Sequence, residues 1–148
     1  MNSQTQKSII QGPVGALEIA LDLPVGDSRG VAVIAHPHPL FAGTMDNKVV
    51  QTLARAFVHC GWTAVRFNFR GVGASTGSYD EGVGEEEDAR AAIDFLRAQA
   101  PGLPIWVAGF SFGARVGLTV GARSDDVVKL LGIGLALRMF DYRFLASC

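Results

Sequence analysis

The sequence predicts an α/β domain built on an open, doubly wound, mostly parallel β-sheet that begins with an antiparallel hairpin. Apolar, β-branched runs alternate along the chain with helical patterns, and glycine-rich turns separate them. This alternation is typical of βαβ units, whose crossovers place helices on both faces of a sheet. The chain has 148 residues, of which 49% are hydrophobic, so we expect a single compact domain over residues 1–148.

The first predicted elements are two short strands and one buried strand. Residues 8–10 and 16–21 are predicted strands joined by a turn at 12–15, where glycine and proline gather. The continuous run at 30–35, Gly-Val-Ala-Val-Ile-Ala, is typical of a strand that is buried on both faces of a parallel sheet.

A helix and a further strand follow. Asp46 is expected to cap a helix whose apolar residues recur at helical spacing, and Gly61 suits its C-terminal end. We expect Cys60 to pack within this helix and His59 to lie on the surface. The next strand is predicted over 63–69.

The second half of the chain repeats the pattern. The acidic run at 85–88 suits the positive end of a helix, which is expected to end at Pro101-Gly102. The remaining predicted elements are a strand over 104–109, a helix over 112–120 closed by Gly121, and a strand over 129–135.

The most informative segment is Gly109-Phe110-Ser111-Phe112-Gly113, a G-x-S-x-G pattern between a predicted strand and a predicted helix. A serine hydroxyl is a poor nucleophile unless it stands on a tight turn where a base reaches it, and glycines leave room for that turn. The helix points its free N–H groups at the place where an oxyanion would form. A plain turn capped by serine is the alternative, but the context favours Ser111 as a nucleophile and Phe112 N–H as an oxyanion donor.

A second loop, from His36 to Gly43, follows the strand predicted at 30–35. Its histidines, His36 and His38, lie two residues apart, but no cluster of carboxylates or cysteines accompanies them, so we expect no metal. The turn at 71–77 has neither the lysine of a phosphate-binding loop nor the third glycine of a dinucleotide fingerprint, so we expect no cofactor.

Three motifs in order resemble bacterial proteins of the α/β-hydrolase superfamily. They are H-P-H-P-x-x-x-G-x-x-x-N-K at 36–48, F-N-F-R-G-V-G-x-S at 67–75, and G-F-S-F-G at 109–113. The resemblance implies an α/β-hydrolase fold, hydrolysis of small acyl esters without a cofactor, and Ser111 as the nucleophile. It also implies an oxyanion hole formed by Phe112 N–H and by the loop near Leu40, since proline cannot donate, and a structural turn at 70–75.

The chain departs from this superfamily after Ser111. Triads of this type follow the chain order Ser, Asp or Glu, His, yet His36, His38 and His59 all precede Ser111. We therefore expect an incomplete domain that lacks the last strands and helices, as in a truncated product, with impaired activity. Because triads are recognised by roles rather than by order, His38 or His36 is a candidate substitute base, in the same chain or from a partner subunit.

Composition argues against several partners. The 13 Lys and Arg are scattered and balance 14 Asp and Glu, giving a net charge of −1, so we expect no nucleic acid. The N-terminus has no secretory signal, and the apolar run at 130–137 is far shorter than the ~20 residues that cross a bilayer. These features predict a cytoplasmic protein without a membrane span. Cys60 and Cys148 make no disulfide framework.

Two classes of function compete. The leading hypothesis is an esterase-like serine hydrolase that acts on a small-molecule ester. The alternative is a non-catalytic binding or assembly module that keeps the hydrolase scaffold. The uncharged run at 130–137 would form an open edge of the sheet, so we also expect a homo-oligomer.

Overall fold

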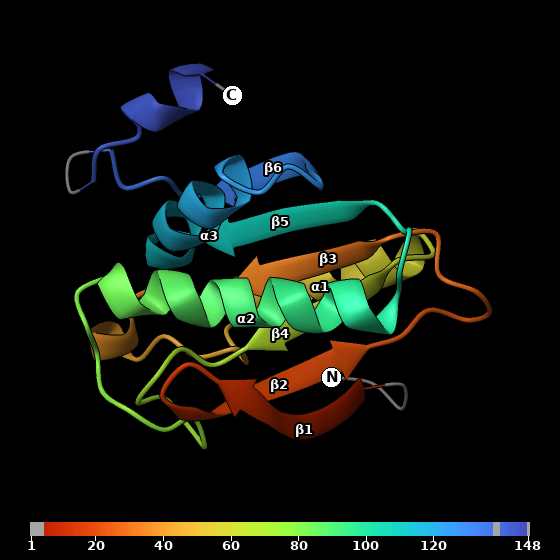
Figure 1. Ribbon diagram of the computed structural model, residues 1–148, viewed down its shortest axis with the longest axis horizontal. Coiled ribbons are helices and arrows are strands. Elements are labelled where there is room, and N and C mark those ends of the chain that lie inside the picture. The colour runs from red at the N-terminus through yellow and green to blue at the C-terminus, as the bar shows by residue number, and fades with distance from the viewer. Residues whose placement is uncertain (1–4, 138–139, 148) are drawn as a thin grey trace.

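The computed structural model describes residues 5–137 and 140–147. Within them lies a six-stranded sheet in the order β1-β2-β4-β3-β5-β6 (Figure 1). The first two strands form an antiparallel hairpin, β2 pairs antiparallel with β4, and the other four strands run parallel. The predicted doubly wound, mostly parallel sheet with an antiparallel N-terminal hairpin is therefore confirmed.

The bounds of the elements follow the alternation of strand and helix. The strands are β1 (Thr5–Gly12), β2 (Gly15–Asp22), β3 (Val31–Ala35), β4 (Thr63–Phe67), β5 (Ile105–Phe110) and β6 (Val127–Ile133). The helices are α1 (Lys48–His59), α2 (Val83–Gln99) and α3 (Phe112–Ala122), with 3₁₀ turns η1 (Pro39–Phe41) and η2 (Arg143–Ser147).

Helices cover both faces of the sheet. In Figure 1, α2 and α3 lie on the near face and α1 lies on the far face. Because successive side chains of a strand point to opposite faces, Val33 packs in the larger apolar cluster under α2 and α3, whereas Ile34 packs in the smaller cluster under α1. All five residues of β3 are buried, as the continuous apolar run predicts.

The start of α1 differs from the prediction. Its N-cap is Asn47, whose Oδ1 accepts hydrogen bonds from the N–H groups of Val49 (2.9 Å) and Val50 (3.2 Å). The carboxylate of Asp46 instead accepts a hydrogen bond from Arg66 Nη1 at 3.1 Å. Two neighbouring residues could each cap the helix, and a contact with a distant strand decides between them.

The end of α1 corrects a second expectation. Gly61 has the positive φ of 85° that suits a residue just past a helix, so its predicted role is confirmed. Cys60, expected to pack within the helix, is an exposed residue at the C-cap, and His59 is exposed as predicted.

Two boundaries near β6 also differ. Gly121 lies inside α3 rather than closing it. Its lack of a side chain lets the helix pack closely on β6, since a Cβ there would stand 2.5 Å from Leu130 Cδ2. β6 begins and ends two residues earlier than the predicted 129–135, and Gly134 directly after it has a φ of 60° that interrupts extended backbone.

The turn after β4 is structural, as the resemblance implies. Arg70 donates three hydrogen bonds to Asp88 of α2, one from its main-chain N–H and two from its guanidinium, and a fourth to Gly84 O. At the other end of the turn, Ser75 Oγ donates to Asn68 O at 2.7 Å. The buried ion pair with Asp88 raises the pKa of Arg70, so this guanidinium stays charged.

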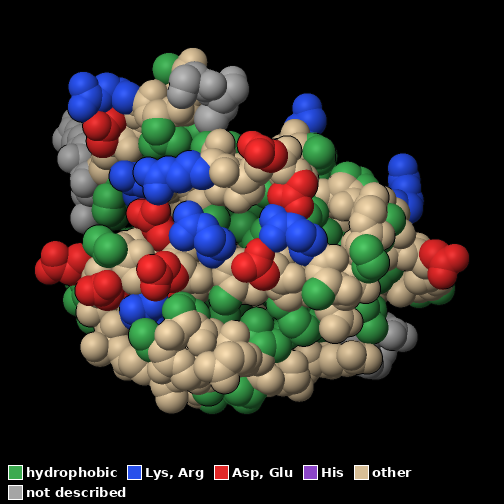
Figure 2. Space-filling view, in the orientation of Figure 1, with side chains coloured by type: hydrophobic (Ala, Val, Ile, Leu, Met, Phe, Trp, Pro, Cys, Tyr) green, Lys and Arg blue, Asp and Glu red, His purple; other side chains and the backbone are tan. Residues whose placement is uncertain are grey.

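Charges of both signs alternate over the near face of the molecule (Figure 2). Arg97 pairs with Asp94 and Asp126, and Arg123 pairs with Glu86, which ties α2 to the elements beside it. Among the helices that the structure describes, none is long and apolar enough to cross a membrane.

Candidate active site

Ser111 stands on a sharp turn between β5 and α3. Its backbone has φ 56° and ψ −115°, a conformation that costs a non-glycine residue on the order of 1–3 kcal/mol and persists only where the surroundings impose it. The Ser111 N–H donates to Ile133 O of β6 at 2.9 Å, which fixes the turn. Strain of this kind at a serine is typical of a nucleophile elbow.

The two glycines of the motif are required by close backbone contacts. A Cβ at Gly109 would stand 2.4 Å from Gly113 O, and a Cβ at Gly113 would stand 2.2 Å from Ala35 O and 2.4 Å from His36 O. The first contact closes the turn on itself. The second presses the start of α3 against the end of β3, so the elbow and the His36–Gly43 loop share one site.

Phe112 is the first residue of α3, so its N–H has no intrahelical acceptor. Within the described residues no other acceptor receives it either. An N–H at the positive end of a helix, directly after the serine, can donate to a negatively charged oxygen.

The loop after β3 turns its N–H groups onto one residue, His38. Leu40 N–H donates to His38 Nδ1 at 3.2 Å, and the N–H groups of Phe41 (3.1 Å) and Gly43 (3.0 Å) both donate to His38 O. Leu40, the oxyanion donor expected from the sequence, therefore uses its N–H inside its own loop.

The second ring nitrogen of His38 is also engaged. His38 Nε2 lies 3.2 Å from Tyr79 Oη. Because Nδ1 accepts from Leu40, we assign the ring proton to Nε2, which donates to Tyr79. The ring lies among those of Phe41, Tyr79 and Phe112, with centroids 4.7, 5.0 and 4.8 Å away. Tyr79 lies 41 residues further along the chain, so no sequence motif marks its contact with His38.

His36 is fully buried and holds two loops together. Its Nδ1–H donates to Pro37 O at 2.6 Å, and its Nε2 accepts from Phe69 N–H at 3.1 Å. Burial lowers the pKa of His36 to about 4, while the bond to Pro37 opposes this shift. The imidazole is therefore neutral at pH 7, and its basic nitrogen already carries a hydrogen bond.

Side chains from β4 and from the turn after it bind the main chain of Met45, between the His36–Gly43 loop and α1. Asn68 Oδ1 accepts from Met45 N–H at 2.8 Å, and Asn68 Nδ2 donates to Glu18 Oε1 at 2.7 Å. Arg66, itself paired with buried Asp22, donates to Met45 O at 2.9 Å. The F-N-F-R motif marks this region of the sequence, but only the fold shows what these side chains contact.

Within the described part of the chain, Ser111 Oγ makes no hydrogen bond to a base. All four ring nitrogens of His36 and His38 have other partners. Among the acids after Ser111, Asp126 pairs with Arg97 and Asp141 with Arg143, and each pairing lowers the pKa of the carboxyl. The strained Ser111 and the unpaired N–H of Phe112 therefore lie side by side at the start of α3, and among the described residues no hydrogen bond joins Ser111 Oγ to a base.

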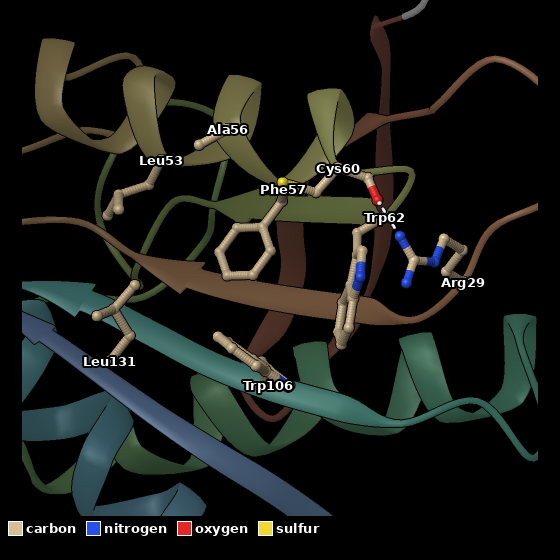
Figure 3. A pocket seen from close by; sticks show the side chains of 8 residues that line it. All are labelled: Arg29, Leu53, Ala56, Phe57, Cys60, Trp62, Trp106 and Leu131. Atoms are coloured by element: carbon tan, nitrogen blue, oxygen red, sulfur yellow. Dashed lines mark hydrogen bonds between the residues drawn. The ribbon is translucent and has the colours of Figure 1, made fainter.

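An apolar groove lies elsewhere, on the α1 face (Figure 3). It measures about 400 Å³. Its lining residues come from α1, from β5 and β6, and from the connections before β3 and β4: Arg29, Leu53, Ala56, Phe57, Cys60, Trp62, Trp106 and Leu131. None of these residues belongs to the Ser111 site. No group of three or more metal-ligating side chains occurs in residues 5–137 and 140–147.

A family model described as serine aminopeptidase, S33, matches residues 40–141, which include the elbow. The chain belongs to this family of α/β serine hydrolases. The α/β-hydrolase fold expected from the motifs is thereby confirmed.

The chain is similar to proteins of known sequence and to solved structures. An uncharacterized protein of Rickettsia prowazekii, RP471, is 38% identical over 93% of the chain. An α/β serine hydrolase homologue from Coxiella burnetii is 43% identical over 99% of the chain, with a TM-score of 0.88. XC6422 from Xanthomonas campestris, an α/β serine hydrolase without a lid, is 42% identical over 96%, also with a TM-score of 0.88. The chain spans 59% of the first protein, 68% of the second and 66% of the third.

Proposed function

We propose that the chain is an esterase-like serine hydrolase that acts on small acyl esters through a Ser111 acyl-enzyme. The observation that supports this most is the strained Ser111 backbone, held between two glycines that admit no Cβ. A protein has little reason to maintain such strain at a serine other than to present its hydroxyl.

The reaction would run in two steps. Ser111 Oγ attacks the ester carbonyl carbon and gives up its proton to solvent water, and the carbonyl oxygen becomes an oxyanion that Phe112 N–H stabilises. The C–O bond to the leaving group then breaks, and the leaving group departs as an anion that takes up a proton from solvent. Water attacks the acyl-enzyme next, which releases the acid and restores the Ser111 hydroxyl.

The expected substrate is an ester rather than an amide, because none of the histidines that the structure describes is placed to protonate the leaving group. An amine leaving group departs only after a general acid protonates it, and no histidine in the described residues is hydrogen-bonded to Ser111 Oγ. An activated ester has a leaving group that departs unprotonated. We therefore expect weak turnover by this chain, with His38 or His36 as the substitute base only if one of them exchanges its present partners.

Among the described residues no hydrogen bond joins Ser111 Oγ to a base, which favours a second candidate function. A non-catalytic binding or assembly module would keep the scaffold, with Ser111 as a relic of catalytic ancestry. The two proposals differ in whether ester cleavage depends on Ser111.

The test is hydrolysis of p-nitrophenyl acetate by the parent, Ser111→Ala, His36→Ala and His38→Ala, with p-nitroacetanilide as the amide control. We expect slow ester cleavage that disappears in Ser111→Ala and no cleavage of the anilide. Cleavage that is unchanged in Ser111→Ala would reject the esterase proposal and leave the binding module. Fast turnover that survives both histidine substitutions would reject the account of the base.

A further inference from the structure

We infer that the apolar groove on the α1 face binds a small amphipathic carboxylate. The apolar chain of this ligand would lie against the aromatic rings of the groove, and its carboxylate would meet Arg29 (Figure 3). The inference assigns a second binding site to the chain, and it does not depend on the role of Ser111.

The groove lies near the end of the sheet opposite to Ser111. Arg29 and Trp62 stand just before β3 and β4, and Trp106 is the second residue of β5, so all three lie at the amino ends of parallel strands. Ser111 follows the carboxyl end of β5. Reacting ligands bind to sheets of this kind at the carboxyl ends of the strands. A ligand in the groove would therefore not be the substrate of Ser111.

Three aromatic rings form the wall of the groove. The rings of Trp62 and Trp106 lie 5.3 Å apart, centroid to centroid, and the Phe57 ring lies 5.9 and 5.8 Å from them. The three rings are inclined to one another by 47 to 86°, so the edge of one ring supports the next. All three side chains are partly exposed. The volume of about 400 Å³ lies within the range of small-molecule pockets, so the wall is formed before a ligand arrives.

The charge of the groove is confined to one end. Of the described residues that line it, Arg29 alone is charged. Figure 3 shows Arg29 beside Trp62, while Leu53 and Leu131 lie at the other end of the groove. A ligand that matches this distribution has an apolar chain and an anionic group at one end of it.

Arg29 is held in place and still has donors for a ligand. Its main-chain N–H donates to Gly61 O at 2.8 Å, and its Nη1 lies 3.4 Å from Cys60 O, which is long for a hydrogen bond. Within residues 5–137 and 140–147, no carboxylate forms an ion pair with this guanidinium. A guanidinium binds a carboxylate through two parallel hydrogen bonds, so a carboxylate is the head group that Arg29 suits.

The test uses tryptophan fluorescence, because both tryptophans of the sequence line the groove. Octanoate is titrated below the concentration at which it forms micelles, and octan-1-ol, which has the same chain length and no charge, is the matched ligand. Arg29→Gln removes the cation of the groove. Arg55→Gln is the matched control, since Arg55 is an exposed residue of α1 that does not line the groove. Thermal melts of each variant check the fold.

We expect octanoate to change the emission saturably and to bind about five- to tenfold more tightly than octan-1-ol, because only the acid pairs with the guanidinium. Arg29→Gln should remove this difference, and Arg55→Gln should keep it. Hexanoate should bind more weakly than octanoate, by up to about fourfold for each methylene lost. Equal affinities for the acid and the alcohol, or equal losses in the two glutamine variants, would overturn the inference.

Ala56→Phe tests the apolar part of the site. Ala56 is exposed on α1 and lines the groove, so a ring there would occupy the groove without disturbing buried packing. Binding of both ligands should weaken by about tenfold or more, because the ring covers apolar surface that the chain would bury. Unchanged binding would overturn the inference. An emission that shifts with protein concentration before any ligand is added, without a saturable response to octanoate, would also overturn it and assign the groove to a second copy of the chain.

Discussion

The elbow around Ser111 and the β6 side of the sheet differ in how they are held. Backbone from β3, β5 and α3 encloses the elbow so closely that neither Gly109 nor Gly113 admits a Cβ. β6, in contrast, pairs only with β5 within the described residues. The residues that follow it, at 140–147, stand apart from the sheet in Figure 1.

The 140–147 segment contacts α3 through aromatic rings rather than through closely packed backbone. Phe140 meets Phe112 edge-on at 6.3 Å between ring centroids, and Arg115 lies over the Phe144 ring at 5.2 Å. Such contacts contribute about 1 kcal/mol each. The nucleophile turn is therefore built by close backbone packing among β3, β5 and α3, and one hydrogen bond, from Ser111 N–H to Ile133 O, ties it to the end of β6.

The largest expected effect comes from Gly113→Ala, which would break the close contact on which this comparison rests. The new Cβ would stand 2.2 Å from Ala35 O, and backbone on both sides would have to move. We expect a loss of about 3 to 5 kcal/mol in the free energy of unfolding, measured by urea denaturation.

Gly117→Ala is the matched control, because its Cβ would stand 3.3 Å from Val107 Cγ1, a side-chain methyl, and at an ordinary contact distance of 3.6 Å from Ala108 O and Ala35 Cβ. A helix-interior alanine gains about 1 kcal/mol over glycine, so this variant should keep or exceed the parent's stability. Equal stability of the two variants would show that the packing at Gly113 is not tight.

A somewhat smaller effect is expected from acid, through His36. Its folded-state pKa of about 4 lies below its ordinary value of 6.5, so the unfolded chain binds the proton more readily between those values. The free energy of unfolding should therefore fall as the pH drops through this window, by about 3 kcal/mol. Urea denaturation of the parent at pH 7 and pH 4.5 would measure most of this loss.

His36→Asn separates the contribution of this residue from that of the carboxylates. Asparagine can still donate to Pro37 O but has no group that titrates. The variant should be less stable at pH 7 and should lose less of its stability toward pH 4.5. Parallel pH profiles for parent and variant would contradict the role given to His36.

The smallest expected effect lies at the β6 edge, where we predict self-association. One side of β6 has no partner strand among the described residues, and its sequence has no proline to discourage pairing. Light scattering should show a dimer or larger species at micromolar concentration. Leu131→Lys should weaken assembly by about tenfold, which corresponds to ~1.4 kcal/mol.

Val25→Lys is the control for added charge, since Val25 is 95% exposed in the loop before β3. It should leave the assembly state unchanged. A monomeric parent would reject the prediction of self-association, and an equal effect of both lysines would assign it to net charge rather than to the edge.

Features that depend only on residues close together in the chain could be predicted from the sequence. The elbow at 109–113 and the buried β3 strand are local patterns, so both could be read directly. Asn47, and not the expected Asp46, caps α1, because Arg66 of β4 binds the Asp46 carboxylate. The boundaries of β6 shifted because pairing with β5 and the positive φ of Gly134 fix them.

The partners of the two histidines could not be predicted for the same reason. His36 accepts from Phe69, and His38 contacts Tyr79, each from a distant part of the chain. Whether an imidazole is a base or a structural acceptor depends on these contacts. The hydrogen bond from Leu40 N–H to the His38 ring likewise could not be predicted from the sequence.

If Ser111 is a nucleophile by virtue of its elbow, as we propose, it is the residue that a fluorophosphonate modifies. The parent and Ser111→Ala would be incubated with the reagent, digested and mapped by mass spectrometry. The account predicts slow modification of the peptide that contains Ser111, and none in Ser111→Ala. Modification of other serines, or equal labelling of the variant, would contradict it.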